Sequence, residues 1–156
     1  MTAPARVATR RGHRGRVNAR TLPHVGEWKI ELRGDTRDEV FRRVVTLIAC
    51  VSGHVSGPLG DWEPVTLSAR DDAALLVDWA NELIGRGEAS SMAYGDVRDV
   101  ELTPPAGRAS PDWRLTAQVR GRPVRQWRSP LKAATYHGVR LERRDSQWYA
   151  TLLFDI

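Results

Sequence analysis

The chain has 156 residues, of which 41% are hydrophobic, and this length suits a single domain with a buried core. No apolar run approaches the ~18 residues of a membrane-spanning helix, and the basic N-terminus lacks the apolar stretch of a secretory signal. Cys50 is the only cysteine, which excludes an intrachain disulfide and fits a reducing cytoplasm.

The net charge of +5 comes from the N-terminal segment. Residues 1–20 hold six arginines and no acidic residue, and without these six, 18 basic side chains stand against 19 acidic ones. Because apolar residues are sparse there and aromatic residues are absent, we expect a disordered, solvated tail over residues 1–20. Alternatively, an arm of this charge binds RNA phosphates, with an affinity that falls as salt rises.

The body of the chain begins with a strand followed by a helix. Strict alternation of polar and apolar residues over residues 27–33 predicts a strand with one buried face. Thr36 and Glu39 have the spacing of a capping box, and apolar residues recur behind them at helical spacing. This pattern predicts a helix over residues 36–51, which Gly53 ends.

A second strand and a second helix follow. Residues 65–69 alternate, and Asp71 or Asp72 can cap a helix whose apolar face continues until Gly85 and Gly87 end it.

The second half of the chain is typical of antiparallel strands. Asp145-Ser146 lies between two of them and indicates a hairpin turn. We therefore expect one α+β domain over residues 21–156, a two-layer sandwich with two helices packed on a largely antiparallel sheet. The predicted strands cover residues 97–102, 113–119, 134–143 and 147–154.

Common catalytic motifs are absent from the sequence. It contains no GxxxxGK[ST] or GxGxxG phosphate loop, no GxSxG elbow, and no CxxC or HExxH zinc motif. The four histidines are scattered, and no pattern joins a nucleophile to a base. This argues against ordinary hydrolase or transferase chemistry.

Three carboxyl groups are candidates for a metal site. Asp155 follows an apolar run, so an anchored last strand holds its side chain beside the α-carboxylate of Ile156. Glu27 adds a third carboxylate if the first and last strands are neighbours. Oxygen donors of this kind suit Ca²⁺ or Mg²⁺. The alternatives are a frayed, solvated C-terminus and an ordinary solvent-facing glutamate.

Lys132 is one of only two lysines in a chain with 22 arginines. A compact ammonium there can pair with a carboxylate cluster or bind a phosphate. The alternative is a solvated surface lysine.

Three stretches resemble the archease family. Residues 131–156, LKAATYHGVRLERRDSQWYATLLFDI, resemble its C-terminal signature, which reads LKAVTYHGLKV, then a hairpin, then a terminal F-D-[IV]. Residues 75–84, LLVDWANELI, resemble the second-helix motif LL..WLNELL. Residues 24–41, HVGEWKIELRGDTRDEVF, resemble HTADVGIRAWGETLEELF more weakly.

The resemblance implies a non-catalytic, cytoplasmic accessory protein. Archeases assist an RtcB-type RNA ligase in transfer-RNA splicing and RNA repair by promoting its guanylylation and its multiple turnover. The family's metal site maps onto Asp155 and Ile156, and its functional lysine maps onto Lys132. The family's N-terminal aspartate is replaced by Glu27. Ca²⁺ is the metal we expect, with Mg²⁺ or Mn²⁺ as alternatives, and a divergent archease that has lost the metal is a further alternative.

A different class of function is an RNA-binding module. Its support is the arginine-rich tail, the arginine-rich residues 120–128, and Trp113 and Trp127, whose rings can stack on bases.

Overall fold

The computed structural model describes residues 20–24 and 26–156. The predicted tail over residues 1–20 lies outside these residues, apart from Arg20, which begins the first strand. None of the described helices is long and apolar enough to cross a membrane. The elements, in chain order, are β1 (Arg20–His24), β2 (Glu27–Gly34), α1 (Arg37–Val51), β3 (Glu63–Ala69), α2 (Asp72–Ser90), β4 (Met92–Thr103), β5 (Trp113–Pro123), β6 (Ala133–Arg144) and β7 (Gln147–Asp155).

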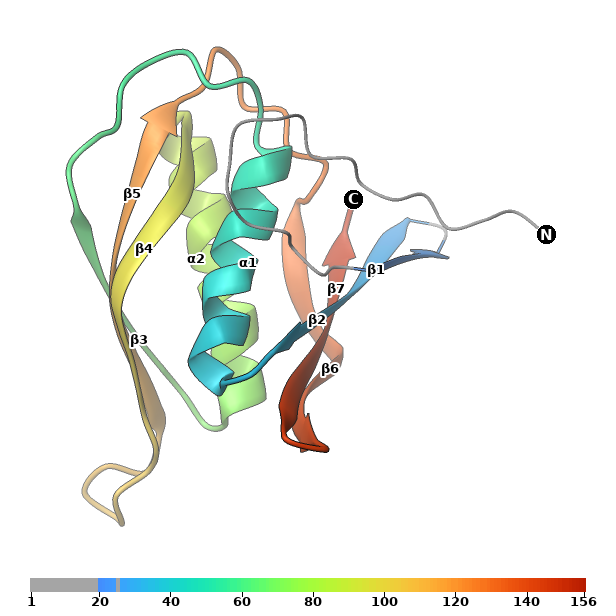
Figure 1. The fold of residues 1–156 in the computed structure, drawn as a ribbon, viewed down its shortest axis with the longest axis vertical. Helices are drawn as coiled ribbons and strands as arrows, with labels where there is room; N and C mark the ends of the chain where they lie inside the picture. Colours follow the sequence, from blue (N-terminus) through green and yellow to red (C-terminus); the bar gives the residue numbers. More distant parts are fainter. Residues whose placement is uncertain (1–19, 25) are drawn as a thin grey trace.

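The α+β class with two helices is confirmed, but the strands form two sheets rather than the single sheet of a two-layer sandwich. A four-stranded sheet has the order β1-β2-β7-β6, a three-stranded sheet has the order β3-β5-β4, and all pairs are antiparallel. The two helices lie between the sheets, and each contacts strands of both (Figure 1).

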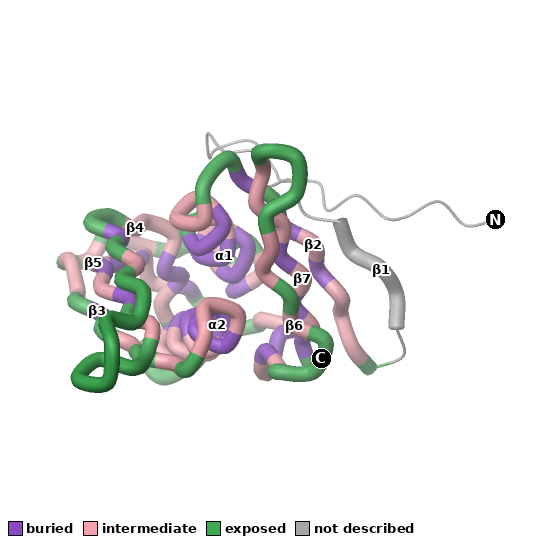
Figure 2. Tube along the Cα trace, turned by 90° about the horizontal axis from the view of Figure 1, so that it is seen from below, coloured by how far each residue is buried: buried purple, intermediate pink, exposed green. Residues whose placement is uncertain are grey.

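The composition of α2 explains why the helices are covered on both sides. Its buried residues include neighbours in sequence, from Ala74 to Val77, so they face several directions around the helix axis. A helix that is apolar around most of its circumference needs partners on more than one side. Figure 2 shows the resulting distribution, with buried positions on both helices and on strands on either side of them.

Local signals place α1 as predicted. Thr36 caps the helix, and its hydroxyl oxygen accepts a hydrogen bond from the Glu39 N–H at 3.1 Å. Glu39 in turn accepts the Asp35 N–H at 2.7 Å. This bond, together with the Arg43 guanidinium, holds the pKa of Glu39 below its ordinary value. The Thr36 half of the predicted capping box therefore forms, whereas the Glu39 carboxylate reaches back to Asp35, one residue before the cap.

The predicted end of α2 is wrong, because the helix continues through Gly85 and Gly87 to Ser90. Gly87 is needed for close packing rather than for ending the helix. A Cβ atom on Gly87 would come within 2.4 Å of the Trp127 ring. The helix ends where Ser91 adopts a left-handed backbone conformation, with φ of 53°.

The predicted strands of the second half are confirmed with longer bounds. β4 begins at Met92 and contains a register shift between Arg98 and Glu101, where Asp99 has φ of 53°. Positive φ at both Asp145 and Ser146 is the conformation of a type I′ turn, which confirms the β6–β7 hairpin.

Arg37 ties the two sheets and the two helices together. Its guanidinium lies 4.1 Å from the ring centroid of Trp148 in the four-stranded sheet and 4.5 Å from that of Trp113 in the three-stranded sheet. Its Nε also pairs with Asp72, at the start of α2, at 3.1 Å. The first residue of α1 thus contacts one residue from each of the other three parts of the fold.

We predict that Arg37→Ala lowers the free energy of unfolding by about 2 kcal/mol, because two cation–π contacts and a partly buried ion pair are lost together. Denaturant unfolding measures the change. Arg70→Ala is the control, since the Arg70 side chain is 83% exposed and its loss should change stability by less than about 0.5 kcal/mol. If the two substitutions lowered the free energy of unfolding equally, the stabilising role assigned to Arg37 would be wrong.

Candidate metal and partner-binding site at the end of the last strand

The pairing of β2 with β7 brings two candidate carboxylates together. Glu27 and Asp155 are directly opposite each other in this antiparallel pair. Alternation along the strands turns Ile30 and Leu152 into the core, so Glu27 and Asp155 share the outer face of the sheet. Side chains opposite each other have Cβ atoms about 5 Å apart, and two like charges in such positions repel.

The chain end beside Asp155 is held on both sides. The Ile156 N–H donates to the Gly26 carbonyl at 3.3 Å, and the Lys132 N–H donates to the Asp155 carbonyl at 2.9 Å. The Ile156 side chain is half-buried against the core. The last residues of the sequence are therefore fixed between β2 and the segment that leads into β6, and this placement does not match the frayed alternative.

Lys132 joins the same site through its side chain. Its Nζ donates a hydrogen bond to the main-chain oxygen of Ile156 at 3.1 Å. Lys132 and Asp155 are exposed, whereas Glu27 and Ile156 are half-buried. The structure thus brings all four predicted site residues together at one end of the four-stranded sheet, and we call this group the terminal cluster.

The metal ligands that the terminal cluster offers are all oxygen atoms. Within the described part of the chain, no three His, Cys, Asp or Glu side chains gather in a way that could hold a metal ion. A metal held here would therefore need the carboxylates of Glu27 and Asp155 together with the terminal carboxyl group of Ile156. Such a set fits a hard divalent cation, which prefers carboxylate and carbonyl oxygens and reduces the repulsion between them.

Asn81 fixes the segment that carries Lys132, and the sequence analysis did not single it out. β6 is an edge strand, and the buried Ala134 near its start bonds to the Asn81 side chain instead of to another strand. The Ala134 N–H donates to Asn81 Oδ1 at 2.7 Å, and Asn81 Nδ2 donates to the Ala134 carbonyl at 3.0 Å. The stretch LLVDWANELI is thereby joined to the stretch LKAATYHG.

A second bond links the same two stretches. The Tyr136 hydroxyl donates a hydrogen bond to Asp78 Oδ1, and this bond raises the pKa of Tyr136.

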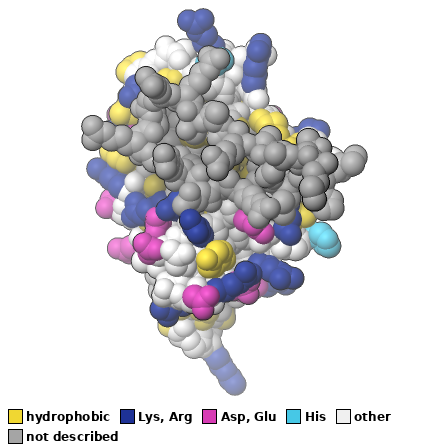
Figure 3. Space-filling view, turned by 45° about the vertical axis from the view of Figure 1, so that its right-hand side comes forward, with side chains coloured by type: hydrophobic (Ala, Val, Ile, Leu, Met, Phe, Trp, Pro, Cys, Tyr) yellow, Lys and Arg dark blue, Asp and Glu magenta, His cyan; other side chains and the backbone are white. Residues whose placement is uncertain are grey.

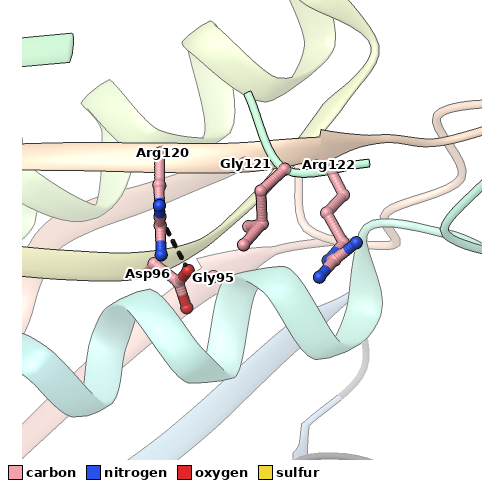
Figure 4. A pocket seen from close by; sticks show the side chains of 6 residues that line it. Gly95, Asp96, Arg120, Gly121 and Arg122 are labelled. Carbon is pink, nitrogen blue, oxygen red and sulfur yellow. Dashed lines mark hydrogen bonds and ion pairs between the residues drawn. The ribbon is translucent and has the colours of Figure 1, made fainter. Parts of the chain in front are cut away.

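Several of the residues that supported an RNA-binding module contact other parts of the fold, whereas Arg125 and Arg128 are exposed. Trp113 is stacked on Arg37, and Trp127 packs against Gly87. Arg120 pairs with Asp96 at 3.0 Å beside a small pocket of about 50 Å³ (Figure 4). Arg122, which also lines this pocket, donates to the Gly57 carbonyl at 3.3 Å. These side chains hold the protein together, and the pocket is far below the size of ordinary ligand sites.

Trp62 is a half-buried aromatic residue that the sequence analysis did not single out. The guanidinium groups of Arg98 and Arg120 lie 4.3 Å and 4.4 Å from its ring centroid. Arg98 also donates to Gln118, so this stack forms a network on the three-stranded sheet.

The fold and the site define a small α+β protein whose carboxyl groups gather where its first long strand meets its last. The Archease protein family (MTH1598/TM1083) matches residues 20–156, and the chain belongs to that family.

Relatives and solved structures agree with this assignment. An archease of Methanosarcina acetivorans is 28% identical over 138 residues, 86% of this chain and 93% of that protein. An archease of Methanopyrus kandleri is 33% identical over 90 residues, and the match spans 55% of this chain and 61% of that protein.

Two solved structures share the fold. The solution structure of Methanobacterium thermoautotrophicum protein 1598 has a TM-score of 0.67 and 18% identity, over 87% of this chain and 96% of the other. The crystal structure of a Thermotoga maritima protein, described as an archease and possible chaperone, has a TM-score of 0.57 and 16% identity, over 93% and 100%.

We predict that Asn81→Ala lowers the free energy of unfolding by about 2–3 kcal/mol, because the buried N–H and carbonyl of Ala134 both lose their partner. Hydrogen exchange followed by NMR should show faster exchange of the Ala134 amide. The neighbouring Glu82→Ala is the control and should leave that amide protected. Unchanged exchange at Ala134 in the Asn81 variant would contradict the role assigned to Asn81.

Proposed function

We propose that this protein is a metal-binding accessory protein that activates an RtcB-type RNA ligase in transfer-RNA splicing and RNA repair. In this role it promotes guanylylation of the ligase and its multiple turnover, acts in the cytoplasm, and catalyses no reaction of its own. One observation carries the proposal: Glu27 lies opposite Asp155, beside a chain end whose oxygen accepts a bond from Lys132.

The donor set supports a divalent cation held by Glu27, Asp155 and the terminal carboxylate of Ile156. Calcium binds six to eight oxygens in flexible geometry, so the extra methylene of Glu27, compared with the family's aspartate, is tolerated. Mg²⁺ demands a stricter octahedron, and we therefore expect Ca²⁺ to bind more tightly than Mg²⁺, with Mn²⁺ as a further alternative. A cation bound here would supply positive charge to a phosphate oxygen of the partner's reaction.

Lys132 positions the third donor. Its ammonium group bonds the Ile156 oxygen, so it restricts the directions in which the terminal carboxylate points. The main-chain N–H of Lys132 also donates to the Asp155 carbonyl, so the Lys132 side chain starts beside the residue that carries one of the carboxylates.

Exposure of the terminal cluster supports an accessory role. Asp155 and Lys132 face solvent at the end of a sheet rather than lining a deep cleft. A site built in this way is accessible to the surface of a partner, and the ligase supplies the nucleophile and the substrate pocket.

We predict that Asp155→Asn weakens Ca²⁺ binding, measured by calorimetry, by about tenfold or more, because a ligand charge is lost. The same variant should fail to stimulate the cognate ligase in an assay with less ligase than RNA substrate. Without metal, its free energy of unfolding should equal or exceed that of the wild type, because repulsion with Glu27 is relieved. Added Ca²⁺ should raise the melting temperature of the wild type more than that of Asp155→Asn.

Asp145→Asn is the matched control, since Asp145 is an exposed carboxylate in the hairpin turn that precedes β7. It should bind Ca²⁺ and stimulate the ligase as the wild type does. If purified Asp155→Asn stimulates the ligase as well as the wild type does, the role that we assign to Asp155 is wrong. A wild type that stimulates the ligase but binds no divalent cation would identify a divergent archease that acts by docking alone.

A further inference from the structure

A hollow of about 440 Å³ adjoins the terminal cluster on the outer face of the four-stranded sheet. β2 and β6 form its two walls, and Thr151 and Leu153 of β7, which runs between them, form its floor. Its size lies within the range of small-molecule sites. The hollow shares Glu27 with the terminal cluster.

An irregularity in β6 makes room for this hollow. The register between β6 and β7 shifts between Thr135 and Arg140, and Gly138 in this bulge has φ of 65°. A Cβ atom on Gly138 would come within 3.3 Å of the Leu153 side chain, so the glycine keeps the bulge close to the floor without filling the space.

The walls carry charged side chains of both signs. Lys29 on β2 and Arg140 on β6 line the hollow, and within residues 20–24 and 26–156 neither side chain donates a hydrogen bond or forms a close ion pair. Arg144, which also lines the hollow, pairs with Glu142 and lowers its pKa, and the charge of Arg140 adds to this lowering at longer range. Glu27 and Glu31 lie on the same wall as Lys29. Figure 3 shows that Lys and Arg side chains lie beside Asp and Glu side chains on the part of this surface that is not drawn in grey.

We propose that the hollow binds the phosphate chain of a metal-chelated polyphosphate, with the metal at Glu27 and Asp155 and the phosphates on Lys29 and Arg140. A free anion would be repelled by the glutamates, whereas a chelated metal neutralises them. Lys29 lies two residues from Glu27 on the same face of β2, about 7 Å away along the strand. A phosphate group at this spacing can contact both a metal held by Glu27 and the ammonium group of Lys29.

The lining defines what the hollow recognises. No Phe, Tyr or Trp side chain lies among the residues that line the hollow, and His137 supplies the one ring among them. Recognition therefore rests on the phosphate chain, whether it belongs to a nucleoside triphosphate, an inorganic tripolyphosphate or the 5′ end of an RNA. This inference rests on the metal site of the proposed function, which the test measures separately.

The test is calorimetric titration of the full chain with inorganic tripolyphosphate, GTP and ATP at saturating Mg²⁺, and again with EDTA. We expect the three ligands to bind with affinities within about tenfold of one another, and EDTA to weaken each of them. Lys29→Met and Arg140→Met should each weaken binding by about tenfold or more, because each removes a charge-assisted hydrogen bond. Arg143→Met is the matched control, because Arg143 lies on β6 but on the opposite face.

Each other outcome overturns a defined part of the account. Absence of tripolyphosphate binding, or binding that neither variant weakens, overturns the inference even if the protein binds Mg²⁺ or Ca²⁺ on its own. A preference of more than tenfold for one base overturns recognition through the phosphate chain. Binding that depends on Lys29 and Arg140 but is insensitive to EDTA and to Asp155→Asn overturns the coupling to the metal site.

Discussion

The antiparallel pairing of β2 with β7 is the interaction on which the rest of the site depends. It places the start of the first long strand beside the end of the last one, so that residues 128 positions apart in sequence, Glu27 and Asp155, are directly opposite each other. The buried alternate residues of both strands fix this register, because a shift by one residue would turn the carboxylates into the core. The same register aligns Lys29 with the floor of the adjoining hollow.

Local chemistry made much of the fold predictable, and tertiary packing decided the rest. The helix cap at Thr36 and the hairpin at Asp145-Ser146 act within a few residues, and both were predicted correctly. The role of Gly87 was missed because it depends on Trp127, which is 40 residues away. β1 was missed because RTLPH does not alternate, and its proline is tolerated only because β1 lies at the edge of a sheet. The division into two sheets depends on which strands pair with one another, and the alternation of apolar residues along the sequence does not predict these pairs.

The terminal cluster was partly predictable for a similar reason. The charged groups of Asp155, Ile156 and Lys132 could be recognised in the sequence as candidates. Whether Glu27 joins them depends on which strand pairs with β2, and only the sheet topology shows this. Asn81 lay within the second-helix motif LL..WLNELL, but the motif assigned it no role, since an asparagine on a helix is ordinary until a strand edge is found beside it. Trp113 and Trp127 were sequence candidates for base stacking, and their neighbours show instead that they support the fold.

The central claim is that carboxyl oxygens from β2 and from the chain end share one cation. Crystals soaked in Mn²⁺, with data collected at an energy where manganese scatters anomalously, test this claim most directly. The account predicts a single anomalous peak between the side chains of Glu27 and Asp155 and the carboxylate of Ile156, at bonding distance from all three. A peak elsewhere on the molecule, or no peak at saturating Mn²⁺, would contradict it.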